Sequence, residues 1–273
     1  CQKGDNALDR LVVIKRILPH LAQNPEFVEA FAREAQIAAR INHPNVVQIH
    51  ELGEAGGLPF IAMEYVLGST VKQLIVSARH AAVRLPVDAA LHLVVQACAG
   101  AHEAHELLDA QGKPYGLVHR DISPHNLMVD ERAHVKLLDF GIAKSRDRLA
   151  RTAQGVVKGK VSYMSPERLL GAEASPSCDA WSLGVVLWEM LAMRSLFISP
   201  DPSDVMRLIV AEHRPSIRDA RPGLPGELAF VVDRMIARSL DGRLTDLHEA
   251  HARLAAFLEP AAVVAAESAL STW

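Results

Sequence analysis

His119-Arg120-Asp121-Ile122-Ser123-Pro124-His125-Asn126 is the stretch that decides the fold, together with Asp139-Phe140-Gly141 a short way downstream. Asp121 offers a carboxylate that can accept a proton, Asn126 an amide that can ligate a metal, and Asp139 a second metal-binding carboxylate. Phosphoryl transfer needs these groups because an enzyme positions the acceptor hydroxyl and neutralises phosphate charge with magnesium and fixed cations. The pattern therefore predicts that Asp121 takes the hydroxyl proton and that Asn126 and Asp139 hold magnesium.

A lysine lies upstream at the end of a β-branched apolar run, Leu11-Val12-Val13-Ile14-Lys15, which is typical of a buried strand with one inward charge. Because an unpaired buried ammonium is costly, Lys15 should have an anionic partner. Glu34 is the best candidate, since it lies in a helical pattern that Asn24 and Pro25 introduce as cap and first-turn residues.

Taken together, these residues resemble a protein kinase, whose signature motifs appear here in order. The resemblance implies ATP and Mg²⁺ as cofactors, with Asp121 as the catalytic base. It also implies that Lys15 contacts the α- and β-phosphates of ATP and pairs with Glu34 on the helix called αC. Asn126 and Asp139 then take the metal-binding roles that their chemistry suggests.

Two further motifs downstream are similar to scaffold motifs of the same family. Ser165-Pro166-Glu167 stands where kinases carry alanine-proline-glutamate near the end of the activation segment, and its glutamate is expected to pair with a late arginine, for which Arg243 is the candidate. Asp179-Ala180-Trp181-Ser182-Leu183-Gly184 resembles the start of the central helix of the large lobe. The resemblance implies that Asp179 braces the backbone of the catalytic loop.

The implied fold is α+β and two-lobed, with a small β-rich N-lobe over residues 1–66 and a large helical C-lobe over 67–258. Residues 259–273 are expected to form a tail or the start of a linker. Apolar periodicity predicts these elements: strands at Leu11–Ile17, Val46–Leu52 and Leu58–Val66, and helices at Val87–Leu108, Leu183–Leu191, Val205–Glu212, Leu228–Ser239 and Leu247–Leu258.

The segment Met63-Glu64-Tyr65-Val66 resembles the hinge between kinase lobes. The resemblance implies that backbone groups of Glu64 and Val66 hydrogen-bond the adenine base and that Met63 is the gatekeeper beside it. Ordinary core packing accounts for Met63 equally well.

Composition agrees with one kinase-sized unit: the chain has 273 residues, 49% of them hydrophobic, and a formal net charge of −3. This charge gives no electrostatic argument for nucleic acid, and no apolar run is long enough to span a bilayer. The three cysteines, Cys1, Cys98 and Cys178, show no paired spacing, and Cys98 falls on an apolar helix face as a reduced core thiol. These features predict a cytoplasmic protein.

The sequence departs from the family pattern at three places. No glycine-rich loop precedes Lys15, since residues 1–10 contain only Gly4; this absence and the initial Cys1 suggest a fragment that lacks its first strand and phosphate-covering loop. Ser123 replaces a lysine common in serine/threonine kinases, so one cation near the γ-phosphate is lost. Lys160 replaces the threonine usual after Gly159.

Regulation by phosphorylation is also implied. The arginine before the catalytic aspartate, Arg120, commonly receives a phosphate on the activation segment in such kinases. Lys144 can join this basic pocket. Thr152 is the leading phosphate carrier, ahead of Ser145 and Ser162, although an ordinary exposed loop residue is an equal interpretation of Thr152.

Three functions are weighed against one another. The first is a bacterial-type serine/threonine protein kinase that acts on an unknown protein. A pseudokinase scaffold gains support from the missing glycine loop but not from the complete set of catalytic residues. A small-molecule phosphotransferase should not keep Asp139-Phe140-Gly141, Ser165-Pro166-Glu167 and the Asp179 motif together. The histidine clusters at 102–105 and 248–251 lack the spacing of a zinc protease helix.

Overall fold

The computed structural model describes residues 11–19, 21–140, 161–211 and 215–259. The elements follow in this order: β1 (Val12–Arg16), α1 (Pro25–Ala38), β2 (Ile49–Ala55), β3 (Leu58–Glu64), β4 (Gly68–Thr70), α2 (Val71–His80), α3 (Val87–His105), β5 (Leu127–Asp130), β6 (Val135–Leu137), the 3₁₀ turn η1 (Val161–Tyr163), α5 (Pro166–Leu169), α6 (Pro176–Ala192), α7 (Pro202–Val210), α8 (Ile217–Ala220), α9 (Gly226–Met235) and α10 (Leu247–Ala255).

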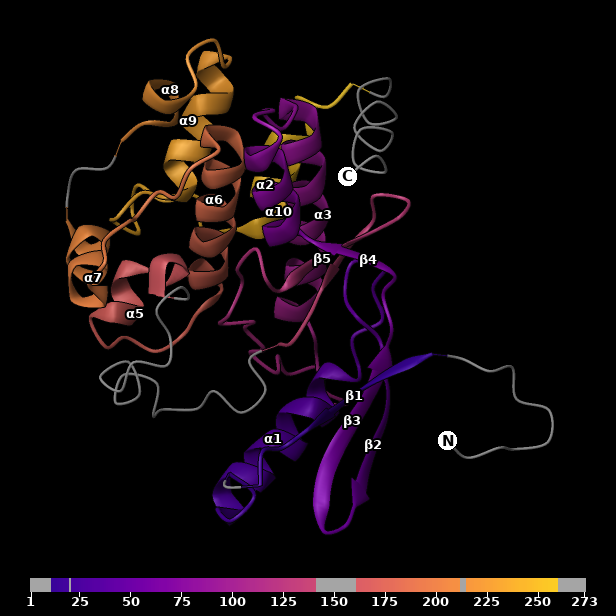
Figure 1. Ribbon diagram of the computed structural model, residues 1–273. Coiled ribbons are helices and arrows are strands. Elements are labelled where there is room, and N and C mark those ends of the chain that lie inside the picture. The colour runs from indigo at the N-terminus through magenta and orange to yellow at the C-terminus, as the bar shows by residue number, and fades with distance from the viewer. Residues whose placement is uncertain (1–10, 20, 141–160, 212–214, 260–273) are drawn as a thin grey trace.

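The first part of the chain forms an antiparallel sheet in the order β1-β3-β2, with α1 beside it (Figure 1). The predicted strand that carries Lys15 is confirmed as β1. It lies at an edge of this sheet, where Val12 is 43%, Val13 39% and Ile14 50% exposed. The strand is therefore present, but it is not the buried strand that its apolar residues predicted.

Helix α1 begins as its sequence predicts. The Asn24 side chain accepts hydrogen bonds from the backbone N–H groups of Glu26 at 3.0 Å and Phe27 at 3.4 Å, and Pro25 occupies the first turn. Such a cap satisfies N–H groups that have no partner inside the helix. The buried side of α1 contains these residues: Phe31, Ala35 and Ala38.

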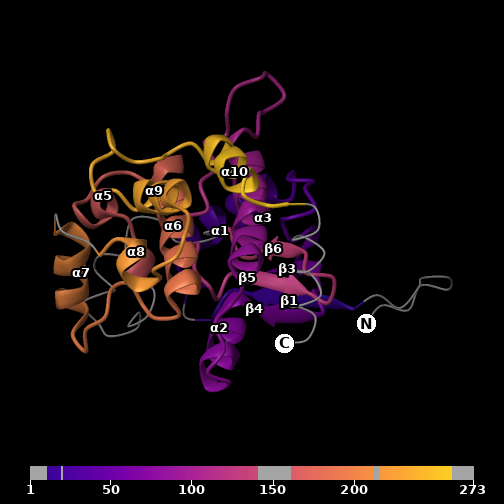
Figure 2. The same ribbon diagram turned by 90° about the horizontal axis from the view of Figure 1, so that it is seen from above.

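Helices form the larger part of the molecule, and the two-lobed α+β fold is therefore confirmed (Figure 1). Helix α6 is buried along most of its length, which explains why its sequence is apolar on all sides. Helix α3 packs against both α6 and α10, and the small β4-β5-β6 sheet adjoins it through β6 (Figure 2). Within the described ranges, no helix is long and apolar enough to span a membrane.

Most predicted elements differ from the observed ones at one or both ends, and helix α6 begins at Pro176 rather than at the predicted Leu183. The strand predicted from Val46 begins instead at Ile49, because Val46 forms an isolated bridge with Leu137 and the Val47 N–H donates to the Leu137 carbonyl at 3.0 Å. Helix α3 ends at His105, before the predicted end at Leu108. The contacts of Val46 and Val47 with Leu137 matter for function, because they attach the segment before β2 to β6 in the helical lobe.

Candidate active site

The backbone of the catalytic loop is fixed by Asp179 at the start of α6. Its carboxylate accepts the His119 N–H at 2.8 Å and the Arg120 N–H at 2.9 Å, and the His105 Nε2 lies 2.8 Å from the same group. Arg120 has a φ of 65°, which is unusual for a side-chain-bearing residue. The brace predicted for Asp179 is therefore confirmed, and it holds a strained loop in place.

The imidazole of His119 joins the catalytic loop to the segment that ends in Asp139. Its Nδ1 accepts the Asp121 N–H at 3.3 Å and its Nε2 lies 2.8 Å from the Leu138 carbonyl. A neutral ring with the proton on Nε2 satisfies both contacts. The ring also lies 4.7 Å from that of Phe140, so Asp121 and Asp139 are positioned by one shared side chain.

Asp121 and Asn126 lie together, as the motif predicted. The Asn126 Nδ2 donates at 2.8 Å to the Asp121 carbonyl and at 2.8 Å to its Oδ2. Asp121 is only 6% exposed, so these bonds orient a buried carboxylate. This geometry suits a proton acceptor at the loop, because a base must be held within hydrogen-bond reach of the group that it deprotonates.

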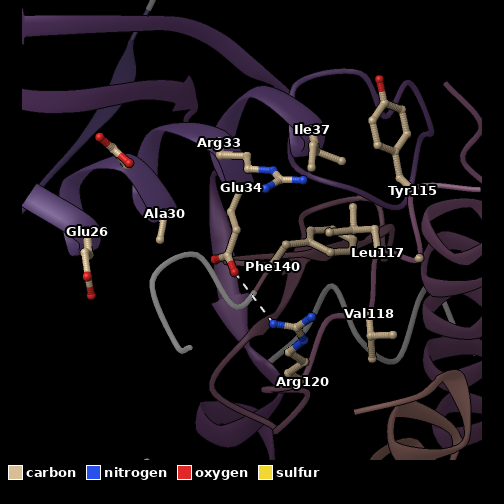
Figure 3. Close-up of a pocket in the computed structure, with 12 residues that line it drawn as sticks. Glu26, Ala30, Arg33, Glu34, Ile37, Tyr115, Leu117, Val118, Arg120 and Phe140 are labelled. Atoms are coloured by element: carbon tan, nitrogen blue, oxygen red, sulfur yellow. Dashed lines mark ion pairs between the residues drawn. The ribbon is translucent and has the colours of Figure 1, made fainter. Parts of the chain in front are cut away.

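In this conformation Lys15 pairs with a carboxylate other than the predicted Glu34. Lys15 Nζ lies 2.6 Å from Asp139 Oδ1, whereas Glu34 Oε1 lies 3.6 Å from Arg120 Nη1 (Figure 3). Among the described residues, Lys15 is thus paired with Asp139 and Glu34 with Arg120. The sequence alone does not say which of these carboxylates Lys15 contacts in a given conformation.

A pocket of about 410 Å³ lies between α1 and the catalytic loop, with the Glu34–Arg120 pair on its wall (Figure 3). Phe140 and Leu117 give it an apolar side, and Arg33 of α1 also lines it. Sequence reasoning did not single out Arg33, although its place next to Glu34 in α1 could have indicated it. Arg33 and Arg120 bring two cations to one pocket.

The residues predicted to hold magnesium fit the ion. Asn126 uses its Nδ2 for Asp121, so its Oδ1 is the atom suited to a metal. Asp139, with a φ of 55° and a side chain 41% exposed, presents carboxylate oxygens. Amide and carboxylate oxygens are the ligands that Mg²⁺ prefers. Among the described residues, this site included, no group of three or more His, Cys, Asp or Glu side chains could hold a metal ion.

The hinge segment places its predicted residues at the end of β3. Met63 is 6% exposed and belongs to the core, as expected in either interpretation. The Glu64 N–H donates to the Gln48 carbonyl at 2.8 Å. An adenine contact from Glu64 would therefore use its carbonyl, and Val66 follows just outside the strand.

The scaffold pair predicted between Glu167 and Arg243 is confirmed. Two hydrogen bonds of 2.8 Å and 2.9 Å join the guanidinium to the carboxylate, and the Arg243 side chain is fully buried. Burial raises the pKa of Glu167, but hydrogen bonds from Arg243 and from the backbone, together with the charge of Arg243, outweigh it and leave the pKa below its ordinary value. The carboxylate is therefore held ionised.

Several predicted features lie outside the described residues. These include the glycine-poor stretch 1–10, Gly141, Lys144, Ser145, Thr152, Gly159, Lys160 and residues 260–273 of the expected tail. Ser162 lies in η1.

Comparison with known proteins gives a consistent assignment. The family described as Protein kinase domain matches residues 2–252. The tyrosine-protein kinase MasK of Myxococcus xanthus is 44% identical over 86% of this chain and 36% of its own length, and serine/threonine-protein kinase PknB of Mycobacterium leprae is 34% identical over 92% and 39%. The chain thus spans less than two-fifths of these relatives.

A solved structure agrees. The crystal structure of the Mycobacterium tuberculosis PknI kinase domain aligns with a TM-score of 0.65 and 27% identity, over 88% of this chain and 83% of that one. The family match runs over nearly the whole chain, and the catalytic-loop geometry accords with it. The chain belongs to the protein kinase domain family.

Proposed function

We propose that this domain is a serine/threonine protein kinase that transfers the γ-phosphate of ATP to a hydroxyl of a protein. The observation that carries the proposal is the buried Asp121 carboxylate, oriented by Asn126 and joined through His119 to the segment that bears Asp139. Proton acceptor and metal-binding oxygens are thus organised by one loop.

In the proposed reaction, the acceptor oxygen forms a bond to the γ-phosphorus while the bond from that phosphorus to the β–γ bridging oxygen breaks. The hydroxyl proton passes to Asp121, and ADP leaves. Asn126 and Asp139 would hold Mg²⁺, which neutralises charge on the phosphates. Lys15 would contact the α- and β-phosphates, with Glu34 as its partner once the pairs seen here exchange.

The hinge and regulatory roles are part of the same proposal. Backbone groups of Glu64 and Val66 would bind adenine beside Met63. Phosphate on the activation segment, with Thr152 as the leading carrier, would be received by Arg120 together with Lys144. Arg33 would help to receive this phosphate, because it lines the same pocket as Arg120.

The proposal that the acceptor hydroxyl belongs to serine or threonine is supported by the names of similar proteins. PknB of Mycobacterium leprae and PrkC of Bacillus subtilis, each 34% identical, are named serine/threonine-protein kinases. MasK, at 44% identity, is named a tyrosine-protein kinase, which makes a tyrosine hydroxyl the second candidate acceptor. The protein substrate itself is not specified by these residues.

The boundaries of the lobes and the location of the protein are also part of the proposal. The domain would divide at residue 66 into an N-lobe and a C-lobe that ends at residue 258, and 259–273 would lead into a linker. A cytoplasmic location is supported by Cys98 and Cys178, which are buried free thiols.

The proposal is tested by incubating the protein with Mg²⁺, γ-labelled ATP and a generic protein acceptor, followed by acid hydrolysis and separation of phosphoamino acids. Label on serine or threonine is expected. Label on tyrosine alone would replace the serine/threonine assignment with the second candidate. Nucleotide binding without any transfer, in a protein phosphorylated on its activation segment, would favour a pseudokinase.

A further inference from the structure

Lys136 of β6 and Glu64 of β3 form an ion pair between the two lobes. Lys136 Nζ lies 2.9 Å from Glu64 Oε2, and the two side chains are only 19% and 23% exposed. The same Oε2 accepts the backbone N–H of Gln48 at 3.2 Å. The Glu64 carboxylate is therefore held by two donors from separate segments.

Backbone hydrogen bonds join the same two strands, β3 and β6, through residues 45–48. Glu64 N–H donates to the Gln48 carbonyl at 2.8 Å, so Gln48 and Glu64 contact each other through both main chain and side chain. On its other side, the segment meets β6: the Val47 N–H donates to Leu137 at 3.0 Å, and the Leu137 N–H donates to Asn45 at 2.8 Å. Residues 45–48 therefore bridge β6 and the end of β3.

Helix α3 anchors the far end of the bridge. Asn45, which is 8% exposed, donates from Nδ2 to Gln96 Oε1 at 2.9 Å and to the Val135 carbonyl at 2.9 Å. A Cβ at Gly100 would lie only 2.7 Å from the Asn45 carbonyl oxygen, so glycine is needed for this close approach. Helix α3 and β6 adjoin in the helical lobe (Figure 2). A continuous polar path thus runs from α3 to Glu64.

We propose that Lys136 is a positioning residue that acts through Glu64 to fix the hinge backbone for recognition of the adenine 6-amino group. This inference rests on the proposed function, because it assumes that the hinge binds adenine. Since the Glu64 N–H is bonded to Gln48, its carbonyl is the group that would accept the 6-amino proton. Loss of the Lys136 charge removes one of the two donors to the carboxylate and loosens the peptide that bears this carbonyl.

The experiment compares Lys136→Met, Glu64→Gln and the double variant with the unchanged protein. Lys113→Met, which removes an exposed loop lysine, is the matched control. Binding of Mg·ADP and Mg·IDP is measured by calorimetry; IDP has an oxygen in place of the 6-amino group. Lys136→Met should weaken ADP binding about fivefold, as expected for loss of a partly exposed ion pair, and change IDP binding by less than about twofold.

The double variant should bind ADP no more weakly than Lys136→Met alone, because the two groups act as a unit. Unchanged ADP affinity in Lys136→Met would overturn the proposal. Equal weakening of ADP and IDP would also overturn it, since that pattern indicates general damage to the site rather than loss of 6-amino recognition.

Hydrogen exchange in the nucleotide-free protein separates this inference from the proposed function. Lys136→Met should speed exchange of the Glu64 amide, which donates to Gln48, and Lys113→Met should leave it unchanged. If the unchanged protein binds neither nucleotide, the proposed function fails. The exchange result still decides whether Lys136 fixes the hinge. An unaltered exchange rate of the Glu64 amide in Lys136→Met would contradict this role.

Discussion

Lys15 of β1 lies 2.6 Å from Asp139, which makes the candidate phosphate-binding lysine a direct partner of the candidate metal-binding carboxylate. Both groups are partly exposed, with side-chain exposures of 31% and 41%. Binding of the nucleotide phosphates to Lys15 and of Mg²⁺ to Asp139 would compete with this ion pair, so the two side chains would exchange partners. Glu34, now near Arg120, is the proposed partner of Lys15 after that exchange.

Lys15→Ala should lower the phosphoryl-transfer rate on the order of 100-fold to 1,000-fold, the usual loss when one donor that stabilises transition-state charge is removed. Steady-state kinetics with varied ATP measure this change. Arg16→Ala, on the same strand, is the control and should leave the rate within about threefold, in the range of surface substitutions. Equal rates for Lys15→Ala and the unchanged protein would contradict the role of Lys15.

Arg243→Met should destabilise the domain by about 3 kcal/mol, because it leaves the partly buried Glu167 carboxylate without its partner. Urea unfolding followed by circular dichroism measures this free energy. Arg253→Met is a matched control, since Arg253 pairs with Glu249 on the surface, where the side chains are 46% and 44% exposed. The control should cost less than about 1 kcal/mol. Similar losses in the two variants would show that burial does not set the strength of the Glu167 pair.

The free energy of unfolding should fall as pH drops below about 6.5, the ordinary histidine pKa. Burial lowers the pKa of His251, and the nearby His248 and His102 lower it further. A group with a depressed histidine pKa binds fewer protons when folded than when unfolded, so acid favours the unfolded chain. His251→Asn should therefore have a shallower loss of stability between about pH 7 and 5.

His50→Asn, which changes an exposed histidine of β2, is the control for this pH dependence. Urea unfolding at several pH values gives the slope for each variant. A slope in His251→Asn as steep as that of the control would mean that His251 does not contribute to acid destabilisation.

The sequence predicted those parts of the fold and site that depend on local chemistry. Asn24 and Pro25 specify the start of α1, and the motif spacing indicated the contacts of Asp179 with the catalytic loop and of Glu167 with Arg243. Each of these has a single suitable partner in the motif pattern.

What the sequence did not predict depends on a choice between equivalent partners. Val46 and Val47 have the apolar, β-branched character of a strand whether they pair with β3 or with Leu137, so the start of β2 was misplaced. Lys15 likewise has two acidic candidates, and only the spatial arrangement of α1 distinguishes Asp139 from Glu34.

The most direct test of the central claim is phosphoryl transfer by Asp121→Asn, measured beside Mg·ADP affinity. This change keeps the side-chain shape but removes the proton-accepting charge. The proposed mechanism predicts a loss of transfer of about 100-fold to 10,000-fold, with ADP affinity and thermal stability nearly unchanged. Transfer at the rate of the unchanged protein would contradict the assignment of Asp121 as the catalytic base.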